Sequence, residues 1–380
     1  MNSDDFNAAK QFLIAYKGTH TTFNTYRREV ERLMQWTWIV AKKSIRELRR
    51  KDLETYIQFC QKPPVRWVGI KKPPRFIDQN GMRIPNPEWR PFVVTLPKAA
   101  HRQGKKPNVK DFEFSNTSIK DLFAVLSTFY NFLISEDYTE VKPVLQIRQK
   151  SRFIQRSQTE TKIRRLSQLQ WDYVISAAEE MAASDPEQHM RTLFIMNALF
   201  AMYLRISELA ASDRWTPKMC DFYRDHDNDW WFITLGKGNK KRQIAVSDAM
   251  LAALKQWRKY LKLSPLPSPA DQSPLLPKTK GKGPIKSTTY IRRLVQTCFD
   301  SAIERLRQDN KAEEAESLLD ATVHWLRHTG ISEDVKTRPR EHVRDDAGHS
   351  SSAITDHYID IELKERHASA RKKQIRQKDK

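Results

Sequence analysis

Apolar side chains recur at spacings of three and four residues over most of this chain, which is typical of helices with one buried face. The clearest early run consists of Phe23, Tyr26, Val30, Leu33 and Trp36. Ser44 and Glu47 have the spacing of a capping box and predict the start of a second helix. A further amphipathic helix is predicted over 118–135. Residues 1–147 are therefore expected to form a helical domain.

Prolines interrupt this pattern between about residues 63 and 110. Because proline lacks a backbone donor and stops helices, the segment is predicted to be an extended or loop-like insertion, with short strands near Phe92–Leu96. Its aromatic side chains, Trp67, Phe76 and Trp89, indicate that it packs against other parts of the protein. Basic pairs within it favour contact with a binding partner.

The later part of the chain combines helices with one β-hairpin. A long apolar helix is predicted over Met190–Leu209. Two β-rich runs, Trp230–Leu235 and Gln243–Val246, flank a glycine-containing turn and predict an antiparallel pair. Shorter helices are expected at 171–181, 248–262 and 287–306.

Between the two patterns lies a polar, basic stretch, 148–165, which is predicted to link two domains. Residues 166–362 are then a mixed α/β domain, and 363–380 a charged C-terminal tail. The expected fold class is mainly α with a small antiparallel β-sheet, in two domains.

Charge changes this picture more than size does. The 380 residues include 67 lysines and arginines against 46 acidic residues, a formal net charge of +21. An excess of this size, spread along the chain, favours a polyanionic partner, most simply nucleic acid. Three distant cysteines favour a reducing compartment. Neither a signal peptide nor a membrane-spanning run is expected from the apolar pattern.

Candidate chemistry gathers near the end of the chain. His324 and Arg327 are one helical turn apart, His349 follows Gly348, and Tyr358 comes nine residues later. Arginines neutralise phosphate oxygens, histidines move protons, and a tyrosine can attack phosphorus. With Arg205 upstream, the set suits phosphoryl transfer through a covalent phosphotyrosine without a metal or other cofactor. No glycine loop with the spacing of an ATP site accompanies it.

Four separated motifs resemble the tyrosine recombinase (phage integrase) family in order and spacing. They are Arg205-Ile-Ser-Glu-Leu209, Gly236-Lys-Gly-Asn-Lys-Lys-Arg242, His324-Trp-Leu-Arg-His-Thr329, and Gly348-His349 with Tyr358. The resemblance implies a helical N-terminal core-binding domain and a mixed α/β catalytic domain.

The resemblance also implies roles for single residues. Arg205 and Arg327 would bind nonbridging oxygens of the scissile phosphate, and His349 would hydrogen-bond it. Lys237 would protonate the departing 5′ oxygen, although Lys240 and Lys241 are close enough to be confused with it. His324 would take the proton of Tyr358, the nucleophile. Other residues of the same types have ordinary explanations: His328 as a core histidine, and packing for Tyr203, Tyr223 and Tyr290.

The sequence departs from the family pattern around His349. Gly330-Ile331 stands where the family usually has Phe-Ala, and Asp346-Ala347 where an apolar pair is usual. The whole segment from Ser332 to Asp346 is polar, which leaves the packing of the helix before His349 open.

The resemblance implies a site-specific DNA recombinase that acts as a homotetramer on paired double-stranded sites, for integration, excision or transposition of a mobile element. Accessory proteins are possible partners, and the insertion is expected to touch DNA or a partner subunit. The location implied is bacterial, cytoplasmic and nucleoid-associated, away from membranes. Alternatives are a type IB topoisomerase-like relaxing enzyme and a DNA-binding protein that does not cut. The basic residues expected to contact DNA are Arg27, Arg28, Lys42, Lys43, Arg49, Arg50, Arg164, Arg165, Lys240 and Lys241.

Overall fold

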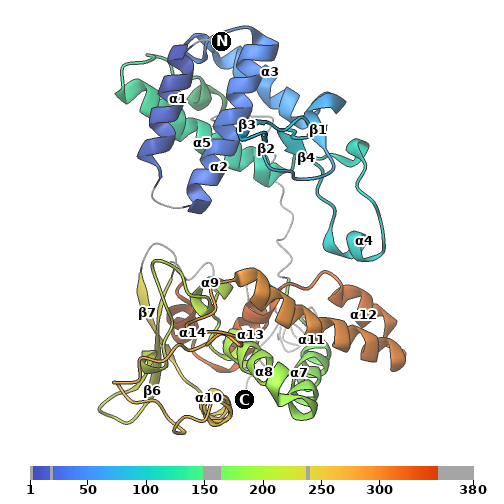
Figure 1. Cartoon of the computed structure of the whole chain (residues 1–380), viewed down its shortest axis with the longest axis vertical. Helices are drawn as coiled ribbons and strands as arrows, with labels where there is room; N and C mark the ends of the chain where they lie inside the picture. Colours follow the sequence, from blue (N-terminus) through green and yellow to red (C-terminus); the bar gives the residue numbers. More distant parts are fainter. Residues whose placement is uncertain (1–2, 18–19, 149–163, 237–239, 350–380) are drawn as a thin grey trace, which may run out of the picture. The chain divides into compact units, whose positions relative to one another are not determined.

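The chain divides into two compact units, Met1–Glu160 and Thr161–Lys380, which are described separately (Figure 1). The computed structural model describes residues 3–17, 20–148, 164–236 and 240–349. Helices dominate both units, and the strands form small sheets of two or three members. The predicted mainly α, two-domain fold class is confirmed. Among the described residues, no helix is both long and apolar enough to cross a membrane.

Unit 1 is a helical bundle with small additions. Its helices are α1 (Ser3–Ala15), α2 (His20–Trp36), α3 (Arg50–Gln61), α4 (Lys98–Arg102), α5 (Asn116–Ser135) and α6 (Pro143–Arg148), with single turns η1 (Thr37–Ala41), η2 (Ile45–Glu47), η3 (Val65–Trp67) and η4 (Val109–Asp111). The ring of Phe12 on α1 packs against Tyr26 of α2 and Phe129 of α5, at centroid distances of 5.5 and 4.9 Å. These aromatic contacts join three helices into one apolar core.

A buried carboxylate adds a polar tie to this core. Asp5 is fully buried and accepts hydrogen bonds from Ser44 Oγ at 2.6 Å, Tyr138 Oη at 2.7 Å and Trp38 Nε1 at 3.1 Å. Ser44 does form the predicted capping box with Glu47, but it caps only η2. The longer helix expected from it was wrong, because the chain is extended at Leu48 and α3 begins at Arg50.

The proline-rich insertion forms two small sheets. Strands β1 (Val68–Gly69) and β4 (Phe92–Val93) pair in parallel, while β2 (Phe76–Gln79) and β3 (Met82–Pro85) form an antiparallel hairpin. Asn80 and Gly81 make the turn with positive φ angles of 53° and 75°. Asn-Gly is the strongest short hairpin signal, so this hairpin could have been found from the sequence.

Unit 2 surrounds two central helices. Its elements are α7 (Gln168–Ser184), α8 (Pro186–Ala201), α9 (Ile206–Leu209), η5 (Met219–Asp221), β5 (Phe222–Arg224), β6 (Trp230–Leu235), β7 (Lys241–Ala245), α10 (Asp248–Tyr260), α11 (Thr288–Gln308), α12 (Ala312–Leu318), α13 (Val323–Thr337) and α14 (Arg340–Ala347). The sheet β5-β6-β7 is antiparallel and contains the predicted hairpin, with Leu235 opposite Lys241. In Figure 1 the sheet lies on one side of α8 and α13 and helix α12 on the other.

The long apolar helix predicted over Met190–Leu209 was wrong. Helix α8 ends at Ala201, Tyr203 takes a left-handed φ of 50°, and Arg205 then precedes the one-turn helix α9. Helix α13 passes closely at this break, because a Cβ on Gly330 would lie 2.2 Å from the carbonyl oxygen of Phe200. The glycine therefore permits a backbone contact that a larger residue would block.

Candidate functional site

Arg327, on α13, is almost completely buried, with 3% of its surface exposed. Its Nη1 donates to the main-chain carbonyl of Tyr203, and its Nη2 donates to that of Ala347 at 2.7 Å. These carbonyls lie just before Arg205 and just before Gly348-His349. Arg327 therefore ties together the two segments that carry other predicted site residues, and main-chain atoms fix its orientation.

Arg205 is held by Glu208, one turn further along. Its backbone N–H donates to Glu208 Oε2 at 2.8 Å, and its Nη1 donates to Oε1 at 3.0 Å. Glu208 itself is buried, with 1% exposure, while Arg205 keeps solvent access. The guanidinium is thus anchored on one edge and can still reach a ligand.

A second arginine holds the same carboxylate. Arg242, on β7, donates from Nη1 and Nη2 to the two oxygens of Glu208, each at 2.9 Å. This is the bidentate geometry that gives an arginine–carboxylate pair its directional strength. Burial lowers the pKa of Arg242, although Glu208 opposes the shift. Arg242 connects the hairpin strand to the support of Arg205.

His349 completes this arrangement. Gly348 ends α14 with a left-handed φ of 65°, and a Cβ there would lie 2.9 Å from Arg242 Cδ. The His349 Nε2 lies 3.3 Å from Arg327 Nη2. Because a guanidinium can only donate, Nε2 accepts and the proton of the neutral ring is assigned to Nδ1. We call Arg205, Glu208, Arg242, Arg327 and His349 the site cluster.

Electrostatics keeps the histidines of this region neutral. Burial, followed by the charges of Arg327 and Arg205, lowers the pKa of His349 to about 4. Burial and the neighbouring His324 and Arg327 lower the pKa of His328 to about 4 as well. His324 is exposed, yet partial loss of water and the charge of Arg327 also lower its pKa. Neutral imidazoles can accept protons at neutral pH, which suits a proton-transfer role.

The polar segment before His349 forms a connected network. Tyr203 Oη donates to Asp334, and Arg338 Nη1 donates to the same tyrosine oxygen at 2.9 Å. Arg338 Nη2 then donates to Asp346 Oδ2 at 2.6 Å, and Asp346 Oδ1 accepts from Ala245 N on β7 at 3.1 Å. The unusual Asp346 is thus a buried partner of Arg338 and the hairpin, and the helix before His349 packs through polar contacts.

Some predicted site residues cannot be placed. Lys237 and Tyr358 lie outside the described residues, so their roles remain predictions. Lys240 and Lys241, next to the turn, are exposed. Arg205, Arg327 and His349 do come together in the structure, and His324 lies one turn before Arg327 on the same helix. Among the described residues, no group of three or more histidines, cysteines or acidic residues could hold a metal ion.

Most basic residues expected to contact DNA lie at the surface, but several already have acidic partners. Arg28 pairs with Glu29, Lys43 with Asp52 and Arg50 with Glu54, at 2.6, 2.6 and 2.9 Å. The exposed members of the set are Arg28, Lys42, Lys43, Arg49, Arg50, Arg164, Lys240 and Lys241, whereas Arg27 and Arg165 are half-buried. Their contact with DNA stays a prediction.

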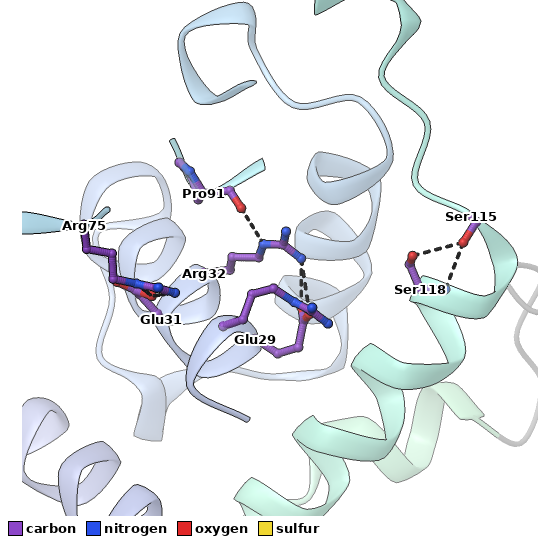
Figure 2. Close-up of polar contacts among 8 residues, drawn as sticks. Glu29, Glu31, Arg32, Arg75, Pro91, Ser115 and Ser118 are labelled. Atoms are coloured by element: carbon purple, nitrogen blue, oxygen red, sulfur yellow. Dashed lines mark hydrogen bonds and ion pairs between the residues drawn. The ribbon is translucent and has the colours of Figure 1, made fainter. Parts of the chain in front are cut away.

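The acidic partners in unit 1 also organise the surface next to the insertion. Figure 2 shows Arg32 pointing from α2 toward Pro91 and Glu29, with Arg75 beside Glu31. Arg32, Arg75 and their carboxylates were not among the residues singled out from the sequence. Only contacts between α2 and a segment some 40 to 60 positions away reveal them.

Comparison with known families decides the wider assignment. The sequence model of the phage integrase family matches residues 164–365, more than half of the chain. This chain belongs to the phage integrase family. The resemblance to tyrosine recombinases is thereby confirmed, and with it membership of a family of DNA strand transferases.

Two curated relatives of this integrase-family protein are tyrosine recombinases. One is XerC of Alcanivorax borkumensis, 26% identical over 43% of this chain and 45% of the relative. The other is XerD of Rickettsia prowazekii, 29% identical over 36% of this chain and 42% of the relative. The matched region therefore spans less than half the length of either relative.

Solved structures share the fold of the integrase-family chain at low identity. A XerH recombinase in a post-cleavage complex with difH DNA covers 96% of this chain and 84% of its own, with 14% identity and a TM-score of 0.57. A lambda integrase dimer on a core site gives a TM-score of 0.51 at 13% identity, covering 99% of this chain and 80% of its own. The Tn1549 transposon integrase gives 0.50 at 15%, with 96% and 97% covered.

Sequence reasoning missed the part played by Arg242 and by the Asp334–Arg338–Asp346 network. Arg242 stood in a quoted motif, and its position in a strand next to a glycine turn was the available signal. The network had no such signal, because its members come from α8, α13, α14 and β7.

Proposed function

We propose that the protein is a site-specific DNA recombinase that cuts and rejoins DNA through a 3′-phosphotyrosyl intermediate. The observation that carries the proposal is the convergence of Arg205, Arg327 and His349 around one buried support. Arg327 and His349 are 3.3 Å apart, and Arg205 and Arg242 share Glu208. The family match over 164–365 supports reading this cluster as a phosphate site.

In the proposed reaction, Tyr358 Oη attacks the scissile phosphorus and the P–O5′ bond breaks. The electron pair leaves with O5′, which Lys237 protonates, and His324 takes the tyrosine proton. Arg205 and Arg327 stabilise the charge on the nonbridging oxygens, and His349 donates a hydrogen bond to them from Nδ1. The 5′ hydroxyl of a partner strand then attacks the phosphotyrosine and releases the tyrosine.

Two further residues position these groups in our proposal. Glu208 holds Arg205, and Arg242 holds Glu208 while packing against Gly348. A guanidinium pair carries fixed positive charge to the phosphate, which is the electrostatic work that a divalent metal performs in other phosphoryl-transfer sites. We therefore expect cleavage to proceed in the presence of a chelator.

The proposed substrate is a pair of double-stranded recombination sites held by a homotetramer, with accessory proteins as further candidates. Support comes from a lambda integrase tetramer bound to a Holliday junction, which has a TM-score of 0.50 to this chain, and from the DNA-bound XerH. The Tn1549 integrase complex with a circular intermediate DNA supports mobile-element integration or excision.

Covalent trapping tests the proposal. The full-length protein would be incubated with nicked suicide duplexes prepared from the genomic neighbourhood of its own gene, and adducts stable to detergent would be counted. We expect adducts at a discrete site with the wild type and none with Tyr358→Phe, because phenylalanine lacks the attacking oxygen. Adducts that persist in Tyr358→Phe would contradict the assignment of the nucleophile.

A second assay separates recombination from relaxation of supercoils. A plasmid with two copies of the trapped site would report exchange between sites, and a supercoiled plasmid without the site would report relaxation. We expect exchange on the first plasmid and no relaxation of the second. Efficient relaxation without site dependence would favour a type IB topoisomerase-like enzyme, and binding without adducts would favour a DNA-binding protein that does not cut.

A further inference from the structure

A hollow of about 470 Å³ lies between α2 and the proline-rich insertion of unit 1. We call it the insertion pocket; its basic lining residues are Arg28, Arg32, Lys72, Arg75 and Arg90. Arg28 and Arg32 come from α2, and the other cations come from the insertion. Since the pocket exists only where the insertion docks on the bundle, it gives the insertion a possible task.

Arg32 has a preset orientation at this pocket. Its Nε donates to the carbonyl of Pro91 at 2.8 Å, and its Nη1 lies 3.2 Å from both oxygens of Glu29. Its guanidinium also stands 4.6 Å from the centre of the Phe92 ring. With 12% of the side chain exposed, the group loses little conformational freedom when it binds a ligand. Figure 2 shows these contacts meeting at Arg32.

The insertion supplies two further ordered guanidiniums. Arg75 pairs with Glu31 at 2.7 Å and stands 5.3 Å from the centre of the Trp89 ring. Arg90 Nη1 donates to the carbonyls of Pro87 and Trp89, at 2.6 and 2.8 Å. Each contact uses part of the five-donor fork of an arginine, so outward-facing N–H groups remain for a further acceptor.

Positive charge exceeds negative charge around the pocket. Five cations face only three carboxylates, those of Glu29, Glu31 and Glu113, among the lining residues. Crowding is visible next to the pocket as well, since burial and then the charge of Arg75 lower the pKa of Arg27. An anion in the pocket would relieve this repulsion.

We propose that the insertion pocket binds a backbone phosphate of duplex DNA. Guanidinium forks match phosphate oxygens in bidentate geometry, and the excess of two positive charges suits a single phosphodiester. The exposed Arg28 and Lys72 let a long polymer approach from solvent. The proposal rests on the proposed function, because it assumes that DNA is the partner, and it adds a contact that the site cluster does not provide.

The salt dependence of DNA binding tests the pocket. The full-length double variant Lys72→Gln/Arg90→Gln would be compared with the wild type on a duplex of about 40 base pairs of random sequence. The matched control, Lys10→Gln/Lys17→Gln, removes two exposed cations from α1 and the residues after it. Lys72→Gln alone serves as a second variant, because Lys72 is exposed and its removal leaves the loop contacts of Arg90 in place.

Each lost phosphate contact lowers the slope of log affinity against log salt by about 0.9. We expect the slope of the pocket double variant to fall by roughly 1 to 2 and its affinity at 150 mM salt by roughly tenfold. The single variant should lose about half of that slope change, and the control should keep the wild-type slope. Equal slopes for pocket and control variants would overturn the proposal.

Two further readings keep the outcomes distinct. If Lys72→Gln/Arg90→Gln weakens binding of poly-glutamate and leaves duplex binding unchanged, the pocket recognises acidic protein segments and the proposal is wrong. Covalent trapping of the wild type is measured in parallel. Adducts with unchanged slopes would sink the pocket alone, whereas a reduced slope without adducts would leave the pocket and remove the proposed recombinase function.

Discussion

The two units hold their arginines in different ways. In unit 2, Arg327 has 3% exposure and donates to the main-chain carbonyls of Tyr203 and Ala347. In unit 1, the side chain of Arg28 is 45% exposed and pairs with a carboxylate, Glu29. Main-chain partners fix a guanidinium without cancelling its charge, whereas a carboxylate partner cancels most of it. The difference indicates that the unit 2 cluster serves chemistry and the unit 1 surface serves affinity.

The largest effect should come from Arg327→Lys. Lysine keeps the charge but loses the planar fork that spans two carbonyls and points at His349. We expect single-turnover cleavage to slow by about 10²- to 10³-fold, as for loss of one donor to a developing charge, with little change in DNA affinity. Adduct formation at saturating DNA measures the rate.

Gly330→Ala probes the packing beneath the unit 2 cluster. The added Cβ would meet the Phe200 carbonyl oxygen at 2.2 Å, so α8 and α13 would have to separate. We expect a loss of about 3 kcal/mol in the free energy of unfolding, measured by denaturant titration. Gly81→Ala in unit 1 is the control, since its Cβ meets nothing within 4 Å and only its φ of 75° is strained. That change should cost about 1 kcal/mol, and equal costs would count against close packing at Gly330.

Arg242→Lys should have a smaller effect, because Arg242 acts through Glu208. One contact to the carboxylate would survive while the bidentate geometry is lost. We expect cleavage to slow by about 10- to 100-fold at unchanged DNA affinity, from misplacement of Arg205. Arg224→Lys, on the exposed strand β5, is the matched control. If Arg242→Gln and Arg242→Lys are equally impaired, charge contributes little and geometry dominates; wild-type rates in both would contradict the positioning role.

The smallest effect concerns protons. In the free protein, burial and nearby arginines hold the pKa of His349 at about 4. A phosphate bound between Arg205 and Arg327 would offset their charge and raise that pKa. The complex would then bind more protons than the free protein, so affinity should rise as pH falls from about 6.5 toward 5. Calorimetry at pH 6 in buffers of different ionisation enthalpy should show uptake of a fraction of a proton, and His349→Gln should reduce it. No uptake in the wild type would argue against a phosphate beside His349.

The sequence was sufficient for features that depend on local patterns or on spaced motifs. Helical periodicity predicted α2 and α5, the glycine turn predicted β6 and β7, and the motif order pointed to the family. The break at Tyr203 could not be predicted, since an apolar run continues through it and the cause is Gly330 on a distant helix.

Polar partners across the chain were equally hidden from sequence reasoning. Asp346 looked out of place because its partners, Arg338 and the Ala245 amide, come from a neighbouring helix and from β7. Pairing over such separations follows from tertiary packing, which single-sequence patterns do not encode. Local regularity was readable, and long-range support for the site was not.

The most direct test of the account compares one arginine from each unit in the same experiment. Cleavage rate at saturating DNA and DNA affinity would be measured for Arg327→Lys and Arg28→Lys, with a chelator present. The account predicts a slow rate with near-normal affinity for Arg327→Lys, and a normal rate with weakened affinity for Arg28→Lys. A normal cleavage rate in Arg327→Lys, or a comparable loss of rate in both variants, would contradict it.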